Sequence, residues 1–317
     1  MKRTSLILLF LFLYLLAAGQ IPFNVKQKKI DSLFARLKTS RDTAYVNVLN
    51  DLSLNLADRN FDSAYRYAQQ ALAWARHYKF KNGEGIAYFN TGNCYFVTMD
   101  LKAALDQYFK ALRILEPLGP SMDLENLYFQ MGYINCLVPN NVRAIDFFRK
   151  TLKTSREIAD STWGGTGACF ELVMYYLQCC SVTTGPEVGQ LLDSAQKYSD
   201  TYLEFLPYDT TRNLDLLIDY LTTKGILLGS AGKKEAYGPL NQAIHFSMKM
   251  QRTKAFSSYW LATSDTTVGE YYIGFCYLNL GGYYLDVLHD LKRGEEYEYK
   301  SLNILKNSAH IETRQSP

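Results

Sequence analysis

The feature that most constrains this fold is a repeat of 40 residues in the first half of the chain. Three sets of residues keep this spacing: Ala64, Ala104 and Ala144; Leu72, Leu112 and Leu152; and Leu52, Gly92 and Gly132. A fixed period of this length is typical of repeat arrays, in which each unit is one supersecondary element stacked on its neighbours. Such arrays present an extended surface more often than an enclosed catalytic pocket. The period therefore predicts a solenoid and disfavours an enzyme.

The second unit shows the pattern of a helical hairpin. Its first helix carries tyrosine, glycine and tyrosine at steps of four and three residues, which is the spacing of one helical face. Its second helix carries alanine and an aromatic residue and is followed by proline. The residues are Tyr88, Gly92 and Tyr95, then Ala104, Tyr108 and Pro117. This order resembles the tetratricopeptide family over most of the chain, although the unit is longer than the 34 residues usual there.

The resemblance implies an all-α fold. We predict an α-solenoid of about six tetratricopeptide-like hairpins that forms a right-handed superhelix, with irregular later units that contain insertions near residues 181–189 and 281–290. The predicted divisions are a signal peptide at 1–19, an N-terminal capping helix at 20–41, an array at 42–306 (regular at 42–160, irregular at 161–306) and a polar tail at 307–317.

The N-terminus has the pattern of an export signal. Lys2 and Arg3 precede an apolar run, Leu6–Ala18, that ends in small residues at Gly19. This run is shorter than the roughly 20 residues of a membrane-spanning helix, and the order is that of a cleaved signal peptide. We predict an exported, periplasmic protein with no membrane span after cleavage. The alternative is an uncleaved segment that anchors the chain in the inner membrane.

Charge and motifs give no support for several classes of function. The 34 basic and 31 acidic residues form no basic stripe in the sequence, so we predict no nucleic-acid partner. The six cysteines include no C-x-x-C pair and the four histidines are scattered, so we expect no metal site, no cofactor and mostly free thiols. The glycine run Trp163–Gly167 lacks the lysine of a phosphate-binding loop and is interpreted as a break between helices. His289 and Asp290 are interpreted as a surface turn, and no catalytic residues are predicted.

The resemblance also implies a binding surface. In tetratricopeptide proteins, residues of the first helices line the concave face of the array. Carried onto this chain by register, these positions are Phe89, Asn93, Phe96, Asn126, Phe129, Tyr133, Tyr176, Tyr271 and Phe275. This mixture of aromatic and amide side chains suits an apolar or aromatic segment of a partner, such as an amphipathic helix. The alternative is that the aromatic side chains fill the space between neighbouring hairpins.

Residues 125–131 read Glu-Asn-Leu-Tyr-Phe-Gln-Met, which matches the cleavage sequence of the tobacco etch virus protease. The segment ends just before Gly132, in register with Gly92. We therefore interpret it as native helix and not as a fusion scar.

A narrower resemblance concerns residues 30–56, with Asp31-Ser32-Leu33 and the run from Val48 to Ser53. This segment resembles the exported N-terminal sensor region of bacterial histidine kinases and signalling regulators. The resemblance implies a signalling kinase or regulator as a partner, but no ATP site or DNA-binding region accompanies it. We expect a non-enzymatic protein- or peptide-binding module in a sensory or adaptor role. The alternative is a self-associating scaffold or assembly factor for an envelope complex.

Overall fold

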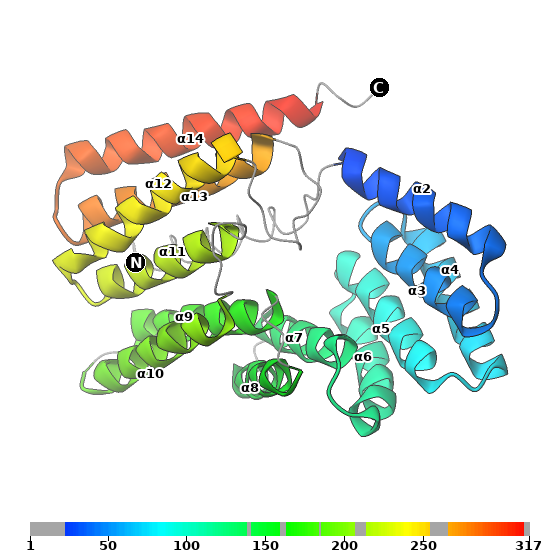
Figure 1. The fold of residues 1–317 in the computed structure, drawn as a ribbon. Coiled ribbons are helices and arrows are strands. Elements are labelled where there is room, and N and C mark those ends of the chain that lie inside the picture. The colour runs from blue at the N-terminus through cyan, green and yellow to red at the C-terminus, as the bar shows by residue number, and fades with distance from the viewer. Residues whose placement is uncertain are drawn as a thin grey trace. The chain divides into compact units, whose positions relative to one another are not determined.

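The computed structural model describes residues 23–137, 141–158, 163–183, 185–206, 214–253 and 266–313. Throughout these residues the regular structure is helical, so the predicted all-α class is confirmed (Figure 1). The chain divides into two compact units, one comprising Ile21–Asp160 and the other containing Ser161–Pro317. The predicted signal peptide lies outside the described residues. Among the described helices, none is long and apolar enough to span a bilayer.

The first unit is a series of helical hairpins in which each helix packs against the next one in the chain. Its helices are α2 (Phe23–Thr39), α3 (Asp42–Leu56), α4 (Phe61–His77), α5 (Lys81–Val97), α6 (Leu101–Leu115), the short η1 (Glu116–Leu118), α7 (Met122–Leu137) and α8 (Asn141–Glu157). Side-chain caps begin two of the second helices: Asn60 accepts from the Ser63 amide at 2.9 Å and Asp100 accepts from the Ala103 amide at 3.0 Å. Such caps satisfy amides that the first turn of a helix leaves without partners.

The second unit continues the hairpin order, with consecutive helices again packed together. Its helices are α9 (Trp163–Val182), α10 (Glu187–Thr201), η2 (Tyr202–Phe205), α11 (Leu214–Ser230), η4 (Lys234–Ala236), α12 (Tyr237–Thr253), α13 (Thr266–Asp286) and α14 (Leu291–Thr313). Helix α14 continues past residue 306, so part of the predicted polar tail is helical. Asn307 and Ser308 do not interrupt it, because neither residue prevents helix formation as proline does.

The structure corrects the interpretation of the glycine run. Trp163–Gly167 does not break the chain between helices but forms the first turns of α9. A Cβ atom on Gly165 would collide with the ring of Phe205. Glycine is therefore required there for close packing of η2 against α9, and its low helix propensity is offset by that packing. The turn predicted at His289 is confirmed, since His289 has a left-handed φ of 55° and Asp290 caps α14 through the Arg293 amide.

Glycine and a large side chain face each other inside the regular hairpins. A Cβ atom on Gly92 of α5 would overlap the ring of Tyr108 on α6, and one on Gly132 of α7 would overlap the ring of Phe148 on α8. Tyr108 is fully buried and Phe148 nearly so. The absence of a side chain on the first helix thus makes room for an aromatic ring from the second.

The first hairpin reverses this arrangement of sizes. Leu52 lies at the position equivalent to Gly92, and Ala68 lies at the position equivalent to Tyr108, in each case 40 residues earlier. Both residues are fully buried. The same space between two helices is therefore filled from the first helix in one unit and from the second helix in the next two, as expected for interiors packed to constant density.

A buried amide pair links neighbouring hairpins in the same register. Asn90 of α5 donates through Nδ2 to the carbonyl oxygen of Asn50 on α3 at 3.0 Å, and Asn50 in turn donates to the carbonyl oxygen of Gly83 at 3.1 Å. The two asparagines are 40 residues apart in the sequence. Because a buried amide is costly without partners, these bonds fix how one hairpin stacks on the next.

The protease-like segment is a packed part of α7. Leu127, Phe129 and Met131 are buried, and Glu125 is 1 % exposed. Cleavage by a protease of this kind requires an extended segment, which α7 can supply only by unfolding locally. The prediction that residues 125–131 are native helix is confirmed.

Folded protein is therefore expected to resist the tobacco etch virus protease at Gln130. As a matched control, the same seven residues followed by a short polar tail are appended after Pro317, where the protease should cut after the glutamine at its normal rate. Mass spectrometry of the digest should show loss of the appended tail and an otherwise intact chain. Release of fragments that end at Gln130, at a rate similar to the control cut, would show that α7 is loosely held.

Candidate functional site

The structure buries four of the nine residues predicted to line a concave face. Phe89, Phe129, Tyr133 and Phe275 are each between 3 % and 8 % exposed. Phe129 packs against the ring of Phe148 in the same hairpin, with ring centroids 5.7 Å apart. These four side chains therefore expose little surface to a partner in this structure.

The remaining predicted positions have different environments. The Asn93 Oδ1 atom accepts a hydrogen bond from the Tyr108 hydroxyl at 2.7 Å, so this amide supports the interior ring. Phe96 is partly buried and meets Tyr133 of the next hairpin edge to face at 5.9 Å. Tyr176 is partly buried against Tyr198, Asn126 is exposed, and Tyr271 lies in α13 with its side chain outside the described part. Binding at this surface remains a prediction.

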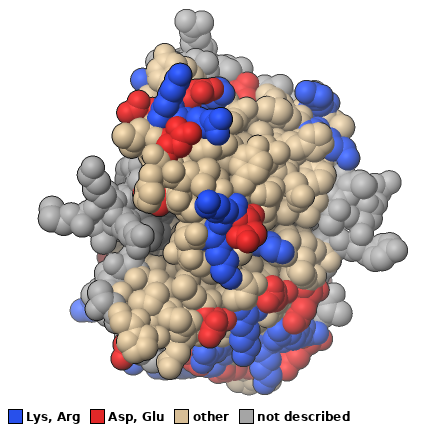
Figure 2. Space-filling model, turned by 90° about the vertical axis from the view of Figure 1, so that its left-hand side faces the viewer, with Lys and Arg blue, Asp and Glu red and all other residues tan. Residues whose placement is uncertain are grey.

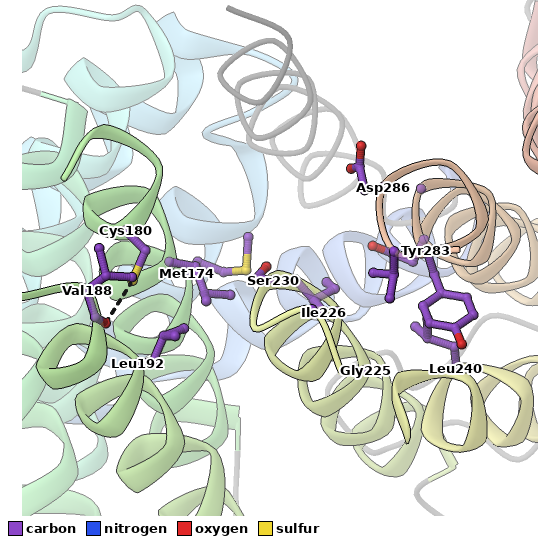
Figure 3. Close-up of a pocket in the computed structure, with 16 residues that line it drawn as sticks. Met174, Cys180, Val188, Leu192, Gly225, Ile226, Ser230, Leu240, Tyr283 and Asp286 are labelled. Carbon is purple, nitrogen blue, oxygen red and sulfur yellow. Dashed lines mark hydrogen bonds between the residues drawn. The ribbon is translucent and has the colours of Figure 1, made fainter. Parts of the chain in front are cut away.

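A pocket of about 200 Å³ lies in the second unit, between the hairpin of α9 and α10 and the helices α11 and α13. Its wall is mainly apolar. Figure 3 shows side chains from α9, α10, α11 and α13 around this space. The apolar part of the wall includes Met174, Leu177, Val188, Leu192, Ile226, Leu240 and Val287.

The sequence contains one signal for this pocket that the repeat register did not reveal. Small residues cluster at the end of α11 and after it, at Gly225, Gly229, Ser230 and Gly232, and all four line the pocket. A Cβ atom on Gly225 would collide with Leu240, whereas one on Gly229 would meet nothing closer than 3.9 Å. Gly225 therefore allows the hairpin to close, and the lack of a side chain at Gly229 leaves space that an aliphatic residue would occupy.

Few polar side chains line the pocket: Ser230, Asn279, Tyr283 and Asp286, with the Cys180 thiol. Ser230 and Asp286 are exposed, while Asn279 is 7 % exposed. Among the described residues, no lysine, arginine or histidine belongs to the wall. On the molecular face shown in Figure 2, residues of both charge signs are interspersed around broad uncharged areas. This face has no continuous basic stripe of the kind that binds nucleic acid.

The second unit also places carboxyl groups away from water: Glu171 and Asp215 are buried and Asp219 is half-buried. Glu171 of α9 is 5 % exposed, its Oε1 atom has no hydrogen-bond partner, and burial raises the pKa of its carboxyl to about 8. Burial, with the nearby charge of Asp215, raises the pKa of Asp219 well above its usual range. The Asp219 carboxylate lies 3.4 Å from the Tyr272 hydroxyl. A desolvated carboxyl favours its neutral form, so Glu171 is mostly protonated at neutral pH.

Neither the carboxyl groups nor the cysteines form a metal site. In the described part of the chain, no three acidic, histidine or cysteine side chains gather where an ion could be held. All six cysteines lie in that part and none is in a disulfide. Burial raises the pKa of the Cys94 and Cys276 thiols to about 11, which suits packing and not nucleophilic chemistry.

Comparisons with known proteins support the fold. No family model matches the chain, and no curated protein matches it. Among solved structures it is similar to BtubC (BKLC) from P. vanneervenii, with a TM-score of 0.54 and 14% identity over 82% of this chain and 93% of that one. The apo form of the quorum sensor NprR from B. thuringiensis aligns over 96% of this chain and 99% of its own, at 13% identity and a TM-score of 0.36. The fold, with its sequential hairpins, is that of an all-α solenoid of packed helical hairpins.

Proposed function

We propose that the chain is a non-enzymatic binding module that recognises a protein or peptide segment. The observation that carries this proposal is the apolar pocket between successive hairpins. Its volume of about 200 Å³ is below the roughly 300 to 1,000 Å³ of pockets that enclose whole small molecules. A pocket of this size is suited to one or two anchoring side chains of a larger partner.

The setting that we propose is the bacterial envelope, in a sensory or adaptor complex. This part of the proposal rests on the export-signal pattern and on the resemblance of residues 30–56 to exported sensor regions. Cell fractionation, with N-terminal sequencing of the purified protein, tests it. A mature terminus near Gly19 in the periplasmic fraction is expected. A chain that keeps Met1 in the cytoplasm would contradict export.

The peptide-binding proposal is tested by selection from a displayed peptide library and by titration of the selected peptides. Ile226 is half-buried and lines the pocket, so Ile226→Trp should fill it and weaken binding about tenfold or more, consistent with the loss of one buried anchor. Leu228→Trp is the matched control, because Leu228 lies on the same helix, is equally half-buried and does not line the pocket. Equal affinity in all three proteins would place binding elsewhere.

Self-association of the array as a scaffold is the alternative function. Light scattering of the purified protein separates the two. A concentration-independent monomer mass supports the adaptor, and a stable oligomer that persists on dilution supports the scaffold.

A further inference from the structure

The pocket of the second unit has a chemical preference that follows from which of its hydrogen-bonding groups are already used. The Tyr283 hydroxyl donates to the carbonyl oxygen of Lys234 at 3.0 Å. The Asn279 Nδ2 atom donates to the carbonyl oxygen of Phe275 at 2.9 Å. Both donors therefore already have acceptors within the protein.

The orientation of the Asn279 amide is determined by that bond. A carbonyl oxygen only accepts, so the side-chain atom that faces Phe275 is the nitrogen. This leaves Oδ1, an acceptor, and the second N–H of the amide as the groups that Asn279 can offer to a ligand. Asp286, at the edge of the pocket, adds two carboxylate oxygens, which are also acceptors.

Among the described residues of the wall, the charged group left for a ligand is thus the Asp286 carboxylate, while Asn279 can both donate and accept. Ser230, whose hydroxyl can donate or accept, completes the set. In Figure 3, Asp286 lies at the border of the labelled residues, while Met174, Leu192 and Ile226 surround the space itself. A ligand that fits has an apolar body and a hydrogen-bond donor, best a cation, at one end.

We propose that this pocket binds a branched aliphatic side chain of a partner peptide, with a lysine or arginine of the same peptide placed next to Asp286. The inference rests on the proposed peptide-binding function and specifies the partner's chemistry at this site. Aliphatic contact with the wall supplies the affinity, and Asp286 selects the positive charge over a negative one.

Two neighbouring thiols provide the readout. Cys180 lines the pocket and Cys179 does not, although both are partly buried. Iodoacetamide labelling followed by peptide mass spectrometry gives the alkylation rate at each thiol in the same molecule. A ligand in the pocket should slow alkylation of Cys180 and leave the alkylation rate of Cys179 unchanged. The Cys179 rate therefore serves as an internal control for local unfolding of this part of the protein.

Three small probes share one branched five-carbon body and differ in charge: 3-methylbutylammonium, 3-methylbutanol and 3-methylbutanoate. Each is used at about 10 mM, because ligands with so few atoms bind weakly. If the ammonium probe occupies two thirds of the pockets, the Cys180 rate falls about threefold. The alcohol should protect less, and the carboxylate least.

Two peptides test whether the ligand is part of a chain or a free amine. One helical peptide carries a lysine four residues after a leucine. The second peptide carries glutamate in place of that lysine. The lysine peptide should protect Cys180 at a lower concentration than the free ammonium probe. Protection by the ammonium probe alone would assign the pocket to a small amine and overturn the peptide proposal.

Asp286→Asn should remove the preference for the ammonium probe while the alcohol still protects. Asp193→Asn is the control, because Asp193 is an exposed carboxylate of α10 outside the pocket. Equal protection by the ammonium and carboxylate probes, or a preference that survives Asp286→Asn, would overturn the proposal. Absence of any Cys180 protection would also overturn it, whereas peptides selected at another surface would leave the proposed function in place.

Discussion

Replacing Glu171 with glutamine is expected to reduce the loss of stability that the protein undergoes as the pH rises from 5 to 8. The Glu171 carboxyl has a pKa of about 8 in the folded protein and an ordinary value of 4.5. A raised folded-state pKa means that the stabilising difference is fully present below pH 4.5 and is lost as the pH rises toward 8. Between pH 4.5 and pH 7 this loss is about 3 kcal/mol. Glutamine has a similar shape and carries no proton to lose.

The measurement is the urea midpoint at several pH values, followed by circular dichroism. Hydrogen exchange of peptides from α9 assigns the transition to the second unit. The control is Glu295→Gln, which removes a carboxylate that is exposed. The variant and wild type should converge near pH 4.5 and separate as the pH rises. Parallel curves for wild type and Glu171→Gln would show that Glu171 is not the group responsible.

The second large effect concerns the facing residues of the regular hairpins. Tyr108→Ala should cost about 3 to 5 kcal/mol, because it empties space around a fully buried ring. Gly92→Leu should cost about 1 to 3 kcal/mol, because its side chain meets that ring. The double variant places leucine on the first helix and alanine on the second, as Leu52 and Ala68 do at the equivalent repeat positions. Its loss of stability should therefore be smaller than the sum of the two single losses, by a coupling of about 1 to 3 kcal/mol.

Urea titration of wild type, both single variants and the double variant measures this coupling. Gly189→Leu is the matched control for the glycine substitution, because a Cβ atom on Gly189 of α10 meets nothing within 4 Å. It should be neutral or slightly stabilising, since leucine favours helix more than glycine does. Strict additivity of Gly92→Leu and Tyr108→Ala would mean that leucine does not enter the space vacated by the ring.

The fold was predictable because it depends on short-range patterns. Helical faces, caps such as Asn60 and the period that places Gly92 and Gly132 can be identified within a few tens of residues. The period assigns each residue to a helix face, but it does not state what the neighbouring hairpin places opposite that face. For this reason Phe89 and Phe129, predicted for a binding surface, are buried in packing.

The pocket and the buried carboxyl groups were less predictable for the same reason. Leu177, Ile226 and Asn279 come from three successive first helices, and each position alone is ordinary in a helix. The pKa of Glu171 depends on how completely its surroundings exclude water, which no local pattern determines. In the irregular second unit the repeat register is also weakest, so side chains there could not be placed by counting 40 residues.

The reversed sizes of the first hairpin have a consequence for how such an array can change in length. A recombination event within a hairpin would join the first helix of one unit to the second helix of another. Joining α3 to α6 would put Leu52 against Tyr108, whereas joining α5 to α4 would put Gly92 against Ala68 and leave a void. Gene segments in this region are therefore exchangeable as whole hairpins, with breakpoints between units and not within them.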